Sequence, residues 1–378
     1  MHGLPELNRR QIIFGSVLIV ASVVGLYFLI PRLAGLNQTW GQLKHGDPIL
    51  LVVGGVLEMI SVAGYAVMFK SVVGRGVARL DWRASVEIPL AGIAAIRLFS
   101  AAGAGGVAVT VWALRRAGMS ASLIACRLVA SYVIQYSIYL GALIVCGLGL
   151  WFGVFSGGGS FGITVIPAVL SAAGVALVLS MALVPADFER RLTRMAKRSG
   201  RIGRLAARLA TAPATLGSGV RTAISVVRSR RYGPGAALGA LAYWGFDIAV
   251  LGLSFKAFGQ DLSVAVLVMG YFLGTLGSLL PLPGGIGGVE GGMIGAFAAF
   301  GVPGGRAVIG VLAYRAISFW IPTLPGIFGY IKLRSTVRGW RLEDGDHAEG
   351  DGLDAEREED RPSERTRAGS EHAERAPQ

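Results

Sequence analysis

Six charged side chains lie within or near the edges of long apolar segments of this sequence. They are three acids and three arginines: Glu58, Asp247, Glu290, Arg97, Arg127 and Arg315. A charge in the middle of a membrane-spanning helix costs about 2.5–3.5 kcal/mol on insertion scales, so each should pair with an opposite charge or line a polar cavity. Arginines can hold a phosphate with two hydrogen bonds while carboxylates keep the guanidinium groups in place. The equal numbers also allow a purely structural set of ion pairs that lock the helices together, and both interpretations stay open.

A proline- and glycine-rich break precedes Glu290. Its residues are counted with the six charges as candidate binding residues: Pro283, Gly284, Gly285, Gly287 and Gly288. Proline stops a helix and glycine permits the turn that follows. Glu290 would then lie in the first turn of the next helix, whose free N–H groups and positive dipole end suit a phosphate or a carboxylate. Glycine that serves only close helix packing is the structural alternative.

Catalytic arrangements typical of soluble enzymes are absent from the sequence. The four histidines lie far apart, at His2, His45, His347 and His372, and no phosphate-binding loop, paired-cysteine motif or nucleophile elbow occurs. We therefore predict no catalytic residue, no metal and no cofactor, and we expect that the protein is not an enzyme.

The elements that position these residues are predicted to be membrane helices. Hydrophobic residues make up 53% of the chain and charged residues 16%, whereas soluble proteins carry about 25% charged residues. A bilayer-spanning helix needs roughly 20 apolar residues. The sequence thus predicts an all-α, polytopic membrane helix bundle with six full spans and two broken helix pairs. The full spans are expected at residues 11–30, 48–69, 120–150, 161–184, 234–255 and 307–331.

The two broken stretches, residues 84–114 and 262–302, resemble copies of one another. Gly105-Gly106-Val107 in the first matches Gly287-Gly288-Val289 in the second. Three full spans lie between them, so the copies would enter the membrane from opposite sides, as in transporters built from inverted repeats. In a glycine-rich sequence such a match also arises by chance. Whether each pair is re-entrant or fully spanning is left open.

Charge predicts the orientation and a separate tail. Residues 342–378 hold 13 acidic and 5 basic residues and almost no large apolar ones, so we expect a disordered acidic tail after a membrane domain at 1–341. Residues 188–231 hold 12 basic residues and one acid, which predicts a cytoplasmic loop. Its first half would form a helix on anionic headgroups or an ordinary solvated loop. The distribution also places both termini in the cytoplasm of a plasma-membrane protein. Because the basic residues gather at span ends, it argues against nucleic acid as a partner.

The second broken stretch carries a resemblance to a known family. The string LPLPGGIGGVE at residues 280–290, followed by Gly301-Val302-Pro303 and Tyr314-Arg315, resembles the lysylphosphatidylglycerol synthase transmembrane-region family, also called flippase-like membrane proteins. The resemblance implies translocation of a lipid between leaflets, with an anionic or aminoacylated lipid or a lipid-linked sugar as substrate. It implies translocation rather than synthesis, because an acidic tail stands where some relatives carry a soluble aminoacyl-transferase domain.

Two further functions fit the same sequence. One is a small-solute or ion-coupled transporter that uses the same cavity, and the other is a non-transporting membrane partner of a lipid- or glycan-modifying enzyme. A cavity open sideways to lipid would favour the lipid translocator. A closed aqueous vestibule would favour the small-solute transporter, and a salt-bridged interior without a cavity would favour the partner protein.

Overall fold

The computed structural model describes residues 46–98, 104–183, 201–279 and 285–359, and every regular element in them is helical. The elements in chain order are α4 (Pro48–Val72), α5 (Trp82–Leu98), α6 (Ala104–Arg116), α7 (Ala121–Trp151), α8 (Phe161–Ala182), α10 (Arg201–Arg228), α11 (Gly233–Lys256), α12 (Val264–Thr275), the 3-10 turn η2 (Leu276–Leu279), α13 (Gly288–Ala299) and α14 (Gly304–Glu359). The chain divides into two compact units, residues 1–333 and 334–378. The first unit contains the site described below.

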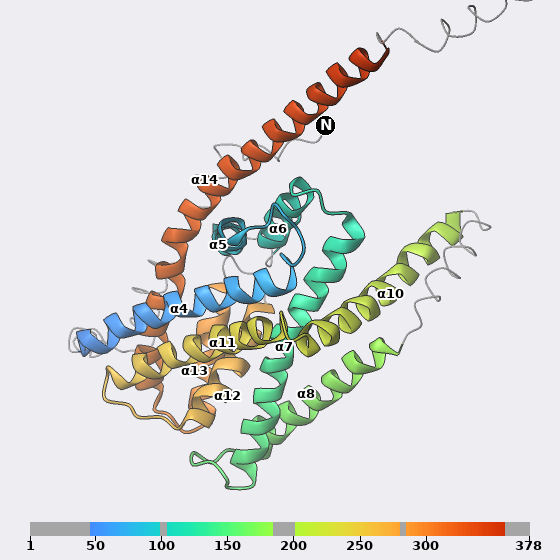
Figure 1. Cartoon of the computed structure of the whole chain (residues 1–378). Coiled ribbons are helices and arrows are strands. Elements are labelled where there is room, and N and C mark those ends of the chain that lie inside the picture. Colours follow the sequence, from blue (N-terminus) through green and yellow to red (C-terminus); the bar gives the residue numbers. More distant parts are fainter. Residues whose placement is uncertain (1–45, 99–103, 184–200, 280–284, 360–378) are drawn as a thin grey trace, which may run out of the picture. The chain divides into compact units, whose positions relative to one another are not determined.

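Among these residues, five helices are long and apolar enough to cross a membrane: α4, α7, α8, α11 and the first part of α14, to Trp340. They coincide with five of the six spans expected from the sequence, and the sixth, at 11–30, lies outside the described residues. The fold is therefore an all-α polytopic membrane bundle, as predicted (Figure 1). Side-chain caps begin several helices. Asp47 accepts the N–H of Ile49 at 2.9 Å at the start of α4, and Ser120 and Ser263 begin α7 and α12 in the same way.

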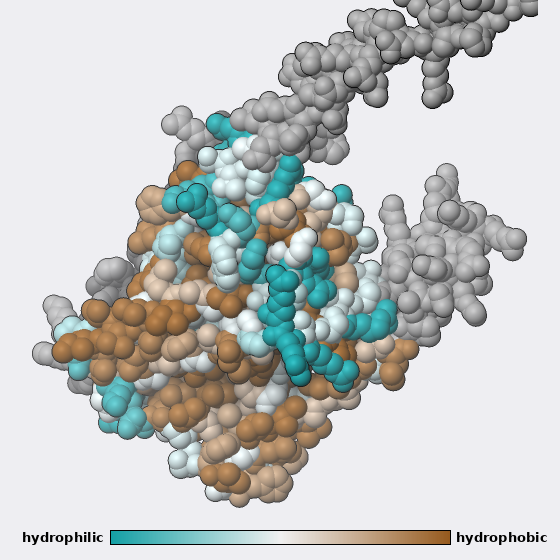
Figure 2. Space-filling view, viewed as in Figure 1, coloured by the Kyte–Doolittle hydropathy of each residue, from teal (hydrophilic) through white to brown (hydrophobic). Residues whose placement is uncertain are grey.

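The outer surface of the spans is apolar. Ile49 on α4 is 72% exposed, and Figure 2 shows apolar side chains, in brown, over much of the face in view. On α8 the buried residues are the small Thr164, Ala168 and Ser171, while the large apolar ones point outward. Small residues inside and large apolar residues outside is the pattern of a helix that packs in lipid.

Both broken stretches form pairs of shorter helices, as predicted. The first consists of α5 and α6, which pack against each other, and its break at 99–103 lies outside the described residues. The second consists of α12, η2 and α13. In the second pair the backbones touch without an intervening side chain, because a Cβ on Gly277 would fall 1.9 Å from the carbonyl oxygen of Gly288.

Much of the basic region at 188–231 forms helix α10. The helix begins at Arg201, in the half where a surface helix was one of two expectations, and runs to Arg228 in the half where no helix was predicted. It packs against α7 and α8, and Val220, Ala223 and Val226 are buried. These three residues recur every third position, so one face of a mostly polar segment is apolar enough to join the bundle. The surface helix expected in the first half lies largely outside the described residues.

Helix α14 continues to Glu359, into the segment expected as an acidic tail at 342–378. The boundary between the two compact units falls between residues 333 and 334, close to the boundary expected at 341. The disorder expected of the tail stays a prediction. Residues 360–378 lie outside the described part.

Helices α4 and α11 approach each other closely through glycine. A Cβ on Gly64 would lie 2.9 Å from the carbonyl oxygen of Gly239, and one on Gly239 would lie 2.7 Å from that of Gly64. The Ser61 hydroxyl donates to the Tyr243 carbonyl at 2.8 Å beside this contact. Gly64 and Gly239 thus hold together the two helices that carry Glu58 and Asp247.

Candidate functional site

A polar cavity of about 430 Å³ lies inside the first unit, between α4, α5, α7, α11, α12, α13 and α14. Four of the six charged residues singled out in the sequence line it: Glu58, Arg97, Asp247 and Arg315. They come from four helices that are far apart in the chain. The fifth, Glu290, reaches the cavity through its bond to Arg315.

Glu290 holds two elements together. Its Oε2 accepts the N–H of Gly287 at 2.7 Å, at the start of α13, and its Oε1 lies 2.6 Å from Nε of Arg315 on α14. Only 2% of Glu290 is exposed. It is therefore both the helix-start residue and the ion-pair partner that the sequence suggested. The N–H that it accepts belongs to Gly287, the residue directly before α13.

Arg315 keeps one hydrogen-bond donor free. Its Nε is bonded to Glu290, whereas its buried Nη2 has no hydrogen-bond partner among the described residues. Leaving a buried charged donor unsatisfied is costly, so such a group in a native fold calls for an explanation. Because Arg315 lines the cavity, an acceptor on a ligand there could fill the missing position.

Arg97 is held by carbonyl groups of α14. Its Nη2 donates to the Ser318 carbonyl at 2.8 Å, and its Nη1 donates to the Phe319 carbonyl and to Thr323 Oγ1. Pro322 lies four residues after Ser318 and has no N–H, so the Ser318 carbonyl lacks its usual partner in the helix. The proline thereby provides an acceptor for a guanidinium group in the bundle interior.

The two guanidinium groups share an aromatic ring. The Cζ of Arg97 lies 5.1 Å from the centre of the Phe319 ring, and that of Arg315 lies 5.5 Å from it. Contact with an aromatic face stabilises a cation. The arrangement places two positive groups near one another beside the cavity, although like charges repel.

Asp247 is satisfied by two tyrosines. Tyr271 donates its hydroxyl to Oδ2 at 2.5 Å, and Tyr314 donates to Oδ1 at 2.8 Å. Sequence reasoning quoted Tyr314 only as part of a motif and missed Tyr271. A tyrosine in the middle of an apolar span needs a hydrogen-bond partner for its hydroxyl. Its position alone therefore indicated that Tyr271 would contact a polar residue.

Arg127 is not among the residues that line the cavity. Its Nη1 donates to the carbonyl of Val73, just after α4 ends, at 2.7 Å. The structure thus brings Arg97, and not Arg127, next to Arg315. Gly285 and Gly287 have positive φ angles of 69° and 87° and form the turn before α13, but neither they nor Gly288 line the cavity. Pro283 and Gly284 lie outside the described residues.

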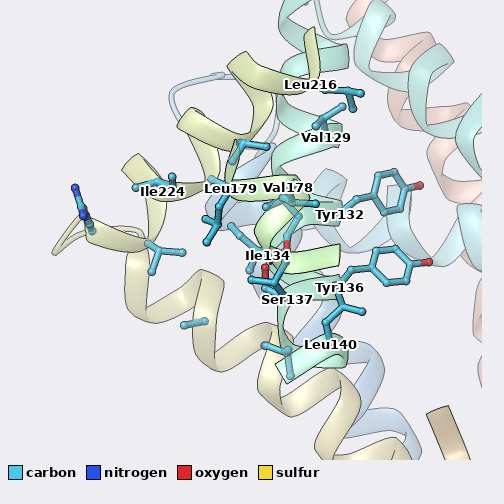
Figure 3. Close-up of a pocket in the computed structure, with 18 residues that line it drawn as sticks. Val129, Tyr132, Ile134, Tyr136, Ser137, Leu140, Val178, Leu179, Leu216 and Ile224 are labelled. Carbon is cyan, nitrogen blue, oxygen red and sulfur yellow. Dashed lines mark hydrogen bonds between the residues drawn. The ribbon is translucent and has the colours of Figure 1, made fainter. Parts of the chain in front are cut away.

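A second, apolar pocket of about 630 Å³ lies between α7, α8 and α10. Its walls include Val129, Ile134, Val178 and Leu179, and Arg228 lies among the lining residues (Figure 3). Tyr132 and Tyr136 project from α7 in the same direction in this view, with ring centres 6.3 Å apart. Of these residues, Tyr136 also lines the polar cavity. Tyr136 therefore contributes to the lining of both spaces, which the sequence did not indicate.

Comparison with known proteins identifies the family. The model of the lysylphosphatidylglycerol synthase transmembrane region matches residues 12–326. The chain belongs to this family. It is 29% identical over 332 residues to a UPF0104 membrane protein of Methanothermobacter thermautotrophicus, a match that covers 83% of this chain and 94% of the relative. A further match to a UPF0104 membrane protein of the same organism is 38% identical over 117 residues, 29% of this chain and 34% of that protein.

Family membership and the five long apolar helices together make the chain a multi-pass membrane protein. Two arginines line the cavity, and Asp247 and Glu290 already accept hydrogen bonds from neighbouring residues. Such an arrangement could accept an anion at the arginines. Among the described residues, no group of three or more His, Cys, Asp or Glu could hold a metal ion.

Proposed function

We propose that this protein moves lipids with an anionic headgroup between the two leaflets of a membrane. The observation that carries the proposal is the buried Nη2 of Arg315, a charged donor without a partner that borders a polar cavity inside a membrane bundle. A phosphodiester oxygen is the acceptor that such a donor favours, because a charge-assisted hydrogen bond to guanidinium is roughly twice as strong as a neutral one.

The neighbouring groups suit a phosphate as well. Arg97 adds a second positive charge beside Phe319, and its carbonyl partners on α14 keep it in place without neutralising it. Glu290 neutralises only one of the two arginines directly. An anion that entered the cavity would supply the acceptor that Arg315 Nη2 lacks.

The apolar pocket suits the other end of a lipid. Acyl chains are stabilised by contact with side chains such as Val178 and Leu179, at about 0.8 kcal/mol for each buried CH₂ group. Since Tyr136 borders both spaces, one amphipathic molecule could place its headgroup in the polar cavity and its tails in the apolar pocket. A small soluble anion would use the first space alone.

The test is translocation of fluorescent phosphatidylglycerol by the full chain in liposomes, measured by quenching from the outside. The variant is Arg315→Lys, which keeps a positive charge beside Glu290 and lacks the free Nη2. Loss of a charged hydrogen bond costs about 1.5–3 kcal/mol, so the rate should fall roughly tenfold or more. The control is Arg306→Lys, because Arg306 is exposed at the start of the same helix and bonds to Gln260.

Equal rates for the two variants would refute the assignment of Arg315. Uptake of inorganic phosphate into the same liposomes, without translocation of the labelled lipid, would identify a small-solute transporter instead. If the wild-type protein moves neither the labelled lipid nor phosphate, the proposal is wrong and the partner-protein hypothesis remains.

A further inference from the structure

One carboxyl group in the cavity has no donor of its own. Glu58 on α4 is 5% exposed, and its Oε2 is buried without a hydrogen-bond partner among the described residues. The other two acids differ from it. Asp247 accepts hydrogen bonds from Tyr271 and Tyr314, and Glu290 accepts them from Gly287 and Arg315.

Glu58 lies near Asp247. Both carboxyl groups line the same cavity and are close enough to influence each other electrostatically, across the close approach of α4 and α11 that Gly64 and Gly239 permit. The titratable and charged groups that face Glu58 from the helices around it are Tyr243 and Asp247 on α11, Arg97 on α5, and Tyr314 and Arg315 on α14. Arg97 is bonded to carbonyl groups of α14, and Arg315 is bonded through Nε to Glu290 while its Nη2 has no partner among the described residues.

Two carboxyl groups this close in a buried site favour one shared proton, because two neighbouring carboxylates repel each other. The surroundings decide which residue carries it. Both oxygens of Asp247 accept from phenol hydroxyls, an arrangement that stabilises the ionised form. Glu58 has no such donor, so the proton resides on Glu58.

We propose that Glu58 is a proton-binding site whose occupancy is coupled to the anionic headgroup in the same cavity. The inference rests on the proposed function and deepens it, because it identifies a proton as the ion that accompanies the lipid. The charges make the coupling positive. With Glu58 protonated, Arg97 and Arg315 balance Asp247 and Glu290, and an entering anion adds a single negative charge. With Glu58 ionised, the cavity already holds one uncompensated negative charge, which repels the entering anion.

Coupling of this kind is reciprocal. Protonation of Glu58 strengthens anion binding, so affinity is highest at low pH and falls as the pH rises and the proton leaves. Conversely, anion binding draws a proton onto Glu58. A proton gradient across the membrane would then drive the lipid toward the side to which protons flow.

The first experiment measures protons directly. Calorimetric titration of the full chain in detergent with short-chain phosphatidylglycerol, repeated in buffers of different ionisation enthalpy at one alkaline pH, gives the number of protons taken up on binding. Wild type should take up close to one proton. The variant Glu58→Gln, which imitates the protonated acid, should take up none and should bind at alkaline pH as tightly as wild type binds at acidic pH.

The control is Asp261→Asn, the same carboxyl-to-amide change at an exposed position between α11 and α12. It should keep the proton uptake of wild type. A misfolded Gln variant would lose binding at every pH, whereas the proposal expects tighter binding at high pH. Proton uptake that persists in Glu58→Gln, or affinity that is independent of pH in wild type, overturns the inference. Affinity that follows sodium concentration instead of pH also overturns it.

The second experiment separates this inference from the proposed function. Infrared spectra of the wild-type protein at neutral pH should contain the C=O stretch of a protonated carboxyl group that is missing in Glu58→Gln and unchanged in Asp261→Asn. This result needs no lipid. If the band is present and no lipid is translocated, the proposed function fails and the proton site stands. If the band is absent and lipid is translocated at a rate that does not depend on a pH gradient, the proton site is wrong and the proposed function stands.

Discussion

Arg97 donates a hydrogen bond from Nη2 to the backbone carbonyl of Ser318, 2.8 Å away on a helix more than 200 positions later in the chain. The carbonyl is available because Pro322 cannot supply the N–H that would normally bind it. A sequence feature usually described as a helix breaker thus provides an acceptor beside a cavity inside a membrane bundle. The position of Arg97 beside Phe319 and Arg315 depends on it.

Substitution of Pro322 by alanine should weaken anion binding without unfolding the protein. The alanine N–H would bond to the Ser318 carbonyl and displace Arg97, and the loss of a charged hydrogen bond predicts roughly tenfold weaker binding of phosphatidylglycerol. Thermal stability should be unchanged or higher, because a helix regains an internal hydrogen bond. Pro325→Ala is the matched control, since the carbonyl four residues before it belongs to Ile321, which is not an Arg97 acceptor. Equal loss in both variants would argue against the Arg97–Ser318 bond.

Filling the apolar pocket should slow lipid movement. Val178 lines the pocket on α8, and Val178→Trp would occupy the space that we assign to acyl chains. The rate of phosphatidylglycerol translocation in liposomes should fall at least severalfold. Val169→Trp makes the same change on the same helix, at a position that is 58% exposed and outside the pocket. The idea fails if the two tryptophan variants behave alike.

Adding a side chain where α4 meets α11 should destabilise the bundle. A Cβ on Gly239 would lie 2.7 Å from backbone atoms of α4, so Gly239→Val should cost about 1–3 kcal/mol as overpacking does in other cores. The melting temperature of the purified protein should fall accordingly. A Cβ on Gly245, also on α11, would meet nothing within 4 Å, so Gly245→Ala should be neutral or slightly stabilising. A stable valine variant would show that the two helices are less closely packed than described.

Accessibility should distinguish the two ends of α11. Basic residues predict that the turn before this helix is cytoplasmic, so a cysteine at the exposed Arg230 should not react with a membrane-impermeant maleimide applied to intact cells. A cysteine at the exposed Asp261, after the helix, should react. Both tests start from a chain in which Cys126 and Cys146 are replaced by serine. Labelling in the reverse order would invert the topology.

The sequence predicted the helices better than it predicted the site. Span length and hydropathy are local properties, and α4, α7, α8 and α11 begin and end close to the expected residues. The break at 280–288 was also visible, because proline and glycine act on their own backbone. The later part of helix α10 was not predicted, because its apolar face is narrow and its composition is mostly that of a loop.

Both Arg127 and Arg97 are candidates in the sequence, and which of them lies in the cavity beside Arg315 depends on how the helices pack. Arg127 lies about 9 Å from the start of α7, close enough for a long side chain to reach back to the carbonyl of Val73. Arg315 lies about 16 Å from the start of α14, too far for its side chain to reach a carbonyl beyond the helix end. Arg97 lies closer still to the end of α5, so distance from a helix end does not separate the two arginines. Nothing local in the sequence places Arg97 against Ser318, since that contact depends on how α5 packs on α14.

The glycine contact inside the second broken pair limits how the molecule can change shape. Where the backbone of Gly277 lies directly on that of Gly288, no layer of side chains remains that could slide. We therefore expect helices α12 and α13 to move together. The bond between Glu290 and Arg315 joins this pair of helices to α14. If the proposed function holds, a headgroup that binds Arg315 would compete with Glu290 and weaken this connection.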